Sequence, residues 1–461
     1  MKSKSQSSKT SISPARAAAF DILLRVERES SYASELLHSH AYDRLSTVDH
    51  SLTTELVMGV LRWRSLLDSR IAATSAQPLS KLDTEILTAL RLAVYQLGWL
   101  TRVPARAAIN ESVELVKRAR KRSAASFVNA VLRKLAAGLS QISPHVISDA
   151  LAETLASSSA HPLWLVERWL KAYGMDSAFR ICQQDQSIPA TAIRLRRPEA
   201  EDQIRAEGIE LAPGALLASA RRVQHGDITK TAAFRAGLCV IQDEASQLVA
   251  ALVGQGVDIL DCCAAPGGKT QAIADRNRAA KISAVELHSH RASLLRRLLR
   301  AHPPLAEAGT RDISVIAADA RSLPFATKFD RVLTDVPCSG TGTLSRNPEI
   351  KWRLKPEDLD DLQERQLAIL QSALAQVAAG GRLIYSTCSL EKEENEDVIE
   401  RALRKDSSLR VIDCGAELEQ LKQNGELIWT DISSLTRGSS LRTLPGVHPC
   451  DGFFAAILEK I

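Results

Sequence analysis

The sequence predicts a multidomain protein in which an all-α domain precedes a small α+β segment and an α/β domain with a parallel sheet. Three observations predict this fold class. The 461 residues are too many for one hydrophobic core, because a domain holds roughly 100–200 residues. Apolar residues recur at helical spacing as far as Ala137. From Val240 onward, short apolar runs alternate with helical stretches.

The predicted all-α domain covers residues 13–140 and follows a Ser/Lys-rich tail, residues 1–12, that is expected to be disordered. Its apolar residues lie three and four positions apart, which places them on one face of a helix. This spacing is found at Leu56, Val57, Val60 and Leu61, and again at Ile86, Leu87, Leu90, Val94 and Leu97. Asp83 precedes the second run, where an N-cap residue is expected.

Charge is distributed unevenly along the chain. Residues 1–145 carry 21 Lys and Arg against 12 Asp and Glu, whereas the remainder carries 38 against 42. A basic half suggests a polyanionic partner, although a solvated basic surface explains the same composition. Five basic residues between predicted helices are candidates for phosphate contacts. Alternatively, they stabilise the end of a helix, because cations near the last carbonyls are favourable there. They are Lys117, Arg118, Arg120, Lys121 and Arg122.

Two regions separate the helical domain from the α/β domain. Residues 141–160 are rich in Ser and Ala and are expected to form a linker. Residues 161–238 form the predicted small α+β segment, with a helix at 161–169 and a strand at 190–196.

The α/β domain is predicted to cover residues 239–461. Its strands are expected at Val257–Leu260, Ile282–Val285, Ile313–Ala317, Phe329–Thr334 and Gly381–Tyr385. Strands that alternate with helices form right-handed crossovers, and the helices then cover both faces of a parallel sheet.

A Gly-rich segment follows the first of these strands and opens a helix. It predicts a ligand loop of Cys263, Ala264, Ala265, Pro266, Gly267, Gly268 and Lys269. A phosphate-binding P-loop would need Gly where Cys263 stands, and the dinucleotide spacing is missing as well. The next two strands end in Glu286 and Asp319, which are placed to accept hydrogen bonds from ribose hydroxyls and an adenine amine. These features predict a nucleoside-type ligand.

Two cysteines follow the last two predicted strands, in the frames Asp335-Val-Pro-Cys338 and Ser386-Thr-Cys388. Two neighbouring thiols can supply a covalent nucleophile and an acid–base group. Taken alone, either Cys338 or Cys388 would more often be a small buried hydrophobic residue. The spacing alone does not settle which thiol is the nucleophile. In DNA cytosine methyltransferases the nucleophile lies in a Pro-Cys frame, which would favour Cys338.

These motifs, in this order, resemble the S-adenosylmethionine-dependent RNA cytosine-5 methyltransferases. The helical domain resembles the transcription antiterminator NusB, and the whole chain resembles the bacterial 16S rRNA enzymes of the RsmB, Sun or Fmu family. The resemblance implies a Rossmann-like class I methyltransferase domain with S-adenosyl-L-methionine as cofactor. Where relatives often read Arg-Val-Asn in the middle segment, this chain reads Arg194-Leu-Arg196, which affects only the expected RNA contacts.

The resemblance also implies roles for the site residues. Cys388 is the expected nucleophile toward carbon 6 of cytosine, and Cys338 assists product release. Asp335 contacts the base and the cofactor, and Lys269 contacts the base or the Gly-rich loop. The expected product is 5-methylcytosine in 16S rRNA, either free or in an early small-subunit particle.

Composition narrows the remaining possibilities. The eight cysteines form no C-x-x-C pair, so neither a zinc site nor another metal is expected. No apolar run reaches the ~20 residues that span a bilayer, and the start of the chain is polar. A cytoplasmic monomer is therefore expected. The rival functions are a tRNA methyltransferase, a non-catalytic RNA-binding assembly factor and a DNA methyltransferase.

Overall fold

The computed structural model describes residues 12–29, 31–138, 152–301 and 312–461. The predicted tail up to residue 11 and the first part of the predicted linker, as far as residue 151, lie outside these ranges. The chain forms two compact units. One ends at Ser187 and also takes in Leu344–Arg353, and the other comprises Ile188–Thr343 and Leu354–Ile461.

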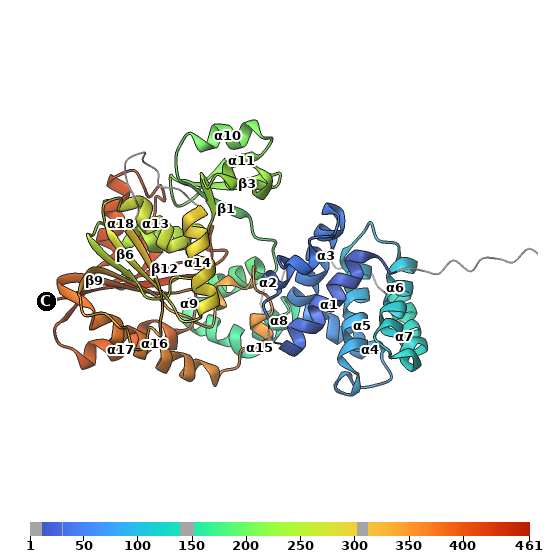
Figure 1. The fold of residues 1–461 in the computed structure, drawn as a ribbon. Coiled ribbons are helices and arrows are strands. Elements are labelled where there is room, and N and C mark those ends of the chain that lie inside the picture. The colour runs from blue at the N-terminus through green and yellow to red at the C-terminus, as the bar shows by residue number, and fades with distance from the viewer. Residues whose placement is uncertain (1–11, 30, 139–151, 302–311) are drawn as a thin grey trace, which may run out of the picture. The chain divides into compact units, whose positions relative to one another are not determined.

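The first unit is helical throughout its described residues, as the apolar spacing predicts (Figure 1). Its helices are α1 (Pro14–Glu29), α2 (Ala33–Leu37), α3 (Thr47–Arg62), α4 (Arg64–Thr74), α5 (Thr84–Trp99), α6 (Ala105–Arg118), α7 (Ala125–Gly138), α8 (Ala152–Ser158), α9 (Leu163–Asp185) and α15 (Ile350–Arg353). Part of the predicted linker is therefore helix α8, and the helix expected at 161–169 extends to Asp185. Both group with the first unit and not with the middle segment.

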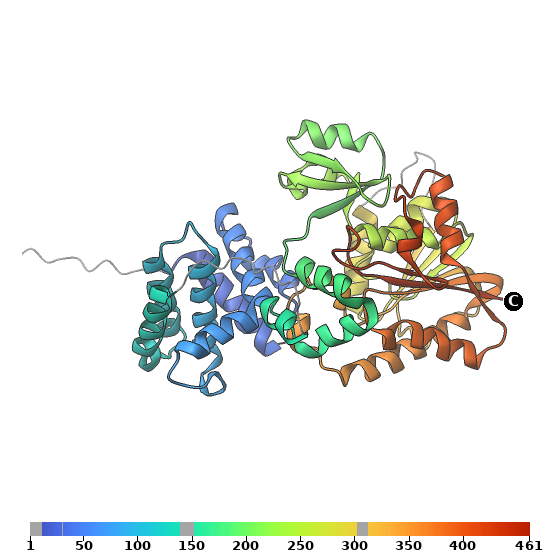
Figure 2. The same cartoon turned by 180° about the vertical axis from the view of Figure 1, so that it is seen from behind.

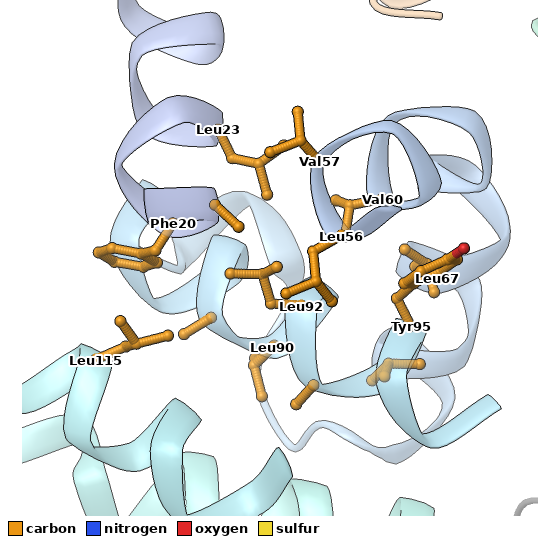
Figure 3. Close-up of a cluster of buried hydrophobic side chains, with 14 of the residues drawn as sticks. Phe20, Leu23, Leu56, Val57, Val60, Leu67, Leu90, Leu92, Tyr95 and Leu115 are labelled. Atoms are coloured by element: carbon orange, nitrogen blue, oxygen red, sulfur yellow. The ribbon is translucent and has the colours of Figure 1, made fainter. Parts of the chain in front are cut away.

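The core of the helical unit is formed by the inward faces of α1 to α7, and Figure 3 shows the part that α1, α3, α4, α5 and α6 contribute. Leu56 and Val57 on α3 are fully buried, as are Leu90 and Leu92 on α5. Each buried leucine contributes about 1.5–3 kcal/mol by leaving water. Asp83 immediately precedes α5, but its carboxylate pairs with Lys121 instead of capping the helix.

A segment that follows the Cys338 loop, Leu344–Arg353, completes this helical unit. Trp352 donates its indole N–H to the carbonyl of Leu61, and Arg353 donates to the carbonyl of Val26 at 2.6 Å. In the other direction, the backbone N–H of Ala33 donates to Glu349 Oε1 at 2.8 Å. Leu61 and Val26 lie near the C-terminal ends of α3 and α1, so the segment satisfies helix carbonyls that are otherwise left without partners.

The second unit begins with a small antiparallel sheet in the order β2-β3-β1-β4. Its strands are β1 (Thr191–Leu195), β2 (Glu210–Pro213), β3 (Ala220–His225) and β4 (Cys239–Ile241), with helices α10 (Ala200–Ala206) and α11 (Ala232–Arg235). Arg194 and Arg196 on and after β1 both bind the carboxylate of Asp275 on α13 (Gly268–Arg276), each at 2.9 Å. These two arginines are buried, so they fasten the small sheet to the larger one.

The large sheet contains nine strands in the described part of the chain. Five are parallel, in the order β9-β8-β5-β6-β7, and they match the predicted strands. They are β5 (Asp258–Asp261), β6 (Lys281–Glu286), β7 (Asp312–Ala317), β8 (Phe329–Asp335) and β9 (Val377–Thr387). β13 (Phe454–Lys460) adds antiparallel to β9, and β10 (Leu409–Ile412) and β12 (Ser440–Arg442) pair with β13, followed by β11 (Thr436–Arg437). The sheet is thus mixed at one edge.

Helices cover both faces of this sheet, as predicted for an α/β domain (Figure 2). One face carries α16 (Asp358–Leu374) and α17 (Glu396–Lys405). The other carries α12 (Glu244–Leu252), α13, α14 (Ser289–Ala301) and α18 (Cys414–Gln423). None of the described helices is long and apolar enough to cross a membrane.

Lys351 is a buried lysine whose cost to the stability of the helical unit can be tested. Its side chain is 1% exposed, and its ammonium group has no hydrogen-bond partner among the described residues. Burial lowers the pKa of Lys351 from 10.5 to about 7. Between these two pH values the unfolded chain binds the proton and the folded chain does not, so the stability of the unit rises with pH across this window.

We therefore expect Lys351→Met to raise the melting temperature at pH 7.5, by about 2–4 °C for each kcal/mol gained. The advantage over the unsubstituted protein should shrink as the pH approaches 10. Thermal unfolding followed by circular dichroism measures both effects. Lys355→Met is the control, because the side chain of Lys355 is 68% exposed. Equal melting temperatures at both pH values would contradict the expected cost of burying this lysine.

Candidate active site

The carboxyl ends of five parallel strands bring the candidate site residues together. Asp261 ends β5, Glu286 ends β6 and Asp335 ends β8, while Asp319 follows β7 and Cys388 follows β9. Parallel strands end at the same edge of a sheet, so side chains from distant parts of the sequence meet there. Because β5 lies between β6 and β8, the chain order reverses at this edge, and ligands of open α/β sheets bind at such a position.

The Gly-rich loop after β5 turns into helix α13 at this edge. Gly267 has φ of 113°, and a Cβ there would lie 2.5 Å from the side chain of Leu295. Only glycine fits both the backbone conformation and the space. Burial, followed by the charges of Asp261, Asp335, Glu286 and Asp319, raises the pKa of Cys263 well above its usual value. Four carboxyl groups therefore surround this loop.

Asp261 shows that the edge is suited to a ligand with N–H or O–H groups. It accepts a hydrogen bond from the hydroxyl of Thr270 at 2.7 Å, and burial raises its pKa to about 6. Its second oxygen, Oδ1, is buried and has no hydrogen-bond partner among the described residues. An unpartnered buried oxygen is costly, so a bound donor would relieve that cost.

Glu286 and Asp319 differ in their availability to a ligand. Glu286 is 6% exposed and uses Oε1 to accept the backbone N–H of His288 at 3.0 Å. Asp319 is more exposed and is held by Arg321 at 2.6 Å. These carboxylate acceptors, with the Gly-rich loop, fit S-adenosylmethionine, because the hydroxyls, amines and cationic centre of that molecule all favour carboxylates. Glu286 would hold the ribose and Asp319 the adenine amine.

The two thiols lie next to each other, with Cys338 Sγ and Cys388 Sγ 3.3 Å apart. Both side chains are partly exposed. A hydrogen bond to Cys388, then burial, then the charges of Cys388, Glu394 and Asp335 raise the pKa of Cys338 well above its usual value. These causes favour the protonated form of the Cys338 thiol.

Asp335 links the thiols to the Gly-rich loop. Its two oxygens accept from Lys269 Nζ at 2.6 Å and from the hydroxyl of Ser386 at 2.7 Å. The pKa of Lys269 is raised. Burial lowers this pKa, but the negative charge and hydrogen bond of Asp335, followed by the charges of Cys388 and Asp261, outweigh burial. The ammonium group also lies 5.0 Å from the ring centre of Phe453. A cation is thus held beside Cys388 at this end of the sheet.

Several residues that shape the site have no signal in the sequence strong enough to predict them. Glu394 follows the Thr-Cys frame in the acidic run Glu391-Lys-Glu-Glu394, which is typical of a solvated turn. It is nevertheless fully buried between the two cysteine loops. Ser386 and Phe453 lie inside motif segments, but only the fold shows that they contact Asp335 and Lys269.

The basic cluster lies in the other unit, at the C-terminal end of α6 and in the turn after it. Three of its members are paired with acids: Lys117 with Glu114, Arg118 with Asp21, and Lys121 with Asp83, at 2.6–2.9 Å. Arg120 and Arg122 are exposed. Neither forms an ion pair within the described residues, so these two are the available cations of the cluster.

Comparison with known proteins finds the same two families. The family described as 16S rRNA methyltransferase RsmB/F matches residues 251–459, and the NusB family matches residues 13–137. A probable ribosomal RNA small subunit methyltransferase B of Bacillus subtilis is 34% identical over 98% of this chain and 99% of its own length.

Two solved structures have similar folds. The crystal structure of PH0851 has a TM-score of 0.78 at 23% identity and covers 98% of this chain and 99% of its own. A methyltransferase homologue from Pyrococcus horikoshii has a TM-score of 0.54 at 25% identity, over 67% of this chain and 98% of its own.

Glu286 gives a direct test of the ligand edge. We expect Glu286→Gln to weaken the binding of S-adenosylmethionine about tenfold or more, because a hydrogen bond to a charged group is worth about 1.5–3 kcal/mol. Isothermal titration calorimetry measures the dissociation constant. Glu364→Gln is the matched control, since that side chain is 66% exposed and its one ion pair within the described residues is with Arg401, at 2.7 Å. Equal affinities for the two variants would argue against a cofactor role for Glu286.

Proposed function

The chain belongs to the RsmB/F family of 16S rRNA methyltransferases, and we propose that it methylates carbon 5 of one cytosine in 16S rRNA. The protein is an RNA methyltransferase, and its cofactor is S-adenosylmethionine, as the sequence motifs predict. The target base and the route of the reaction are the proposal. The observation that carries it is the pair of thiols 3.3 Å apart, beside a carboxylate and an ammonium group at the ligand edge of the sheet.

Carbon 5 of cytosine is a poor nucleophile and needs covalent activation. We propose that the thiolate of Cys388 bonds to carbon 6, which converts the ring into an enamine, while the ring takes up a proton at N3. S-adenosylmethionine supplies the methyl group to carbon 5. Cys338 releases its own proton to solvent, which has supplied the proton at N3, and the resulting thiolate removes the proton from carbon 5. The bond between carbon 6 and sulfur then breaks, which restores the Cys388 thiolate, and N3 returns its proton to solvent.

The electrostatics of the site support this division of roles. The charges of Glu394 and Asp335 act on Cys338 and favour its protonated form, whereas Lys269 places a positive charge near Cys388. This arrangement supports Cys338 as the thiol that keeps its proton until late in the reaction. Once Cys338 has lost its proton, its high pKa makes it a strong base. Asp335, held between Lys269 and Ser386, is positioned to contact the Watson–Crick edge of the base.

The proposed substrate is 16S rRNA, either free or in an early small-subunit particle. An enzyme that modifies a base must take it out of a stack or find it in a loop. The basic helical unit supplies a surface for the surrounding phosphates, and its similarity to NusB favours rRNA over tRNA. We propose that the protein acts as a cytoplasmic monomer.

The cysteine roles predict different outcomes for two substitutions. Cys388→Ala should abolish methyl transfer to unmodified 16S rRNA and form no covalent RNA adduct. Cys338→Ala should also lose turnover but accumulate an adduct that survives denaturing electrophoresis, because the final proton removal is blocked. Cys414→Ala, which removes a buried thiol far along the chain, is the control and should retain activity. Full turnover by Cys388→Ala would refute the proposed nucleophile.

The unpaired cations predict a salt-dependent effect on RNA affinity. Arg120→Ala and Arg122→Ala should each weaken RNA binding similarly for all sequences, and each should reduce the slope of log affinity against log salt by about 0.7–1. Arg118→Ala, whose charge is paired with Asp21, should have a smaller effect. Filter binding at several salt concentrations measures this. Unchanged slopes for both arginines would exclude the cluster from the RNA contact.

A further inference from the structure

Glu394 is a buried carboxyl group between the two cysteine loops, and the reaction proposed above uses only its charge. It is 0% exposed and lies in the turn between β9 and α17. Its Oε1 accepts the backbone N–H of Ser339 at 2.8 Å and the side-chain amide of Gln366 at 2.8 Å. Its Oε2 accepts the hydroxyls of Ser339 and Ser389.

These bonds join residues that follow the two thiols directly. Ser339 is next to Cys338, and Ser389 is next to Cys388. The two hydroxyl oxygens lie 3.0 Å from each other, so one carboxylate oxygen holds both loops at once. A carboxylate suits this place because it only accepts hydrogen bonds and can accept several, and the four groups that face it are donors.

Glu394 is itself held in place by further contacts. Gln366 also donates to the carbonyl of Pro337 at 3.0 Å, and the hydroxyl of Tyr385 donates to the backbone carbonyl of Glu394 at 2.6 Å. The amide of Asn395 donates to the carbonyl of Ser389 at 2.9 Å. The carboxylate is therefore fixed before any substrate arrives, as a preorganised site requires.

We infer that Glu394 is a positioning residue that sets the separation of Cys338 and Cys388 by bonding to the loop that carries each of them. This inference rests on the proposed roles of the two thiols. Among the described residues, Glu394 forms no hydrogen bond with either thiol, and it acts through Ser339 and Ser389. The charge of Glu394 adds a second effect, because it favours the protonated form of Cys338. The hydrogen bond to Cys388 and burial act in the same direction and are larger causes.

The test compares turnover with substrate affinity. In Glu394→Gln, an amide nitrogen replaces one oxygen and cannot accept the hydroxyl bonds, so the loops lose a shared partner. We expect kcat for methyl transfer to fall by about 10- to 100-fold, because misplaced reacting groups cost that much. KM for S-adenosylmethionine and for RNA should stay within twofold. Glu400→Gln, an exposed change on α17, is the control and should leave kcat unchanged.

A second readout does not depend on methyl transfer. Phenylarsine oxide bridges two neighbouring thiols, so its rate of capture reports their separation. We expect Glu394→Gln to slow capture at least tenfold, and the Cys338→Ala/Cys388→Ala variant supplies the background. If the protein proves inactive on RNA but capture still depends on Glu394, the proposed function fails and the positioning role stands. If activity and capture are both unchanged in Glu394→Gln, the inference is overturned.

A second variant tests the positioning role of Glu394 if Glu394→Gln fails to fold. Should Glu394→Gln melt far below the unsubstituted protein, Ser389→Ala removes only one of the bonded hydroxyls. It should then show a smaller loss of kcat and slower capture at a near-normal melting temperature. Normal values of both in a folded Ser389→Ala variant would overturn the inference.

Discussion

The parallel pairing of β8 with β9 positions both cysteine loops, on which the proposed chemistry depends. In this register Asp335 lies opposite Ser386, so the Pro-Cys loop and the Thr-Cys loop leave the sheet side by side. The hydrogen bond from Ser386 to Asp335 and the bond from Gly342 N–H to the carbonyl of Cys388 follow from that pairing. A shift of the register by one residue would turn these side chains to the opposite face of the sheet.

Most of the site edge could be predicted from the sequence because it depends on local patterns. Buried parallel strands are short apolar runs, and the candidate site residues end them or follow them closely. The sequence therefore suffices to predict the places of Glu286, Asp319 and both cysteines. The helical domain was equally clear, because helical spacing of apolar residues at Leu56 and Leu90 is a local signal. The family resemblance, the fold class and the cofactor are confirmed by the comparisons.

Features that depend on long-range packing could not be predicted. Nothing in the sequence near Glu394 distinguishes a buried carboxylate from a solvated one, because its four donors come from three separate segments. Arg194 and Arg196 show the same difficulty. They lie in the stretch Arg194-Leu-Arg196, which differs from the family's Arg-Val-Asn. Their partner Asp275 lies about eighty residues away, so only the fold shows that they are buried in ion pairs.

The segment Leu344–Arg353 has a consequence for how this protein can be divided. The chain passes between the two units after Ser187, after Thr343 and after Arg353, so neither unit is one continuous stretch of sequence. A fragment that ends at Ser187 would lack Trp352 and Arg353, which bind carbonyls at the ends of α3 and α1. A cut of the chain after Ser187 therefore separates the helical unit from ten residues that complete it, and any fragment meant to hold the whole unit must also carry Leu344–Arg353.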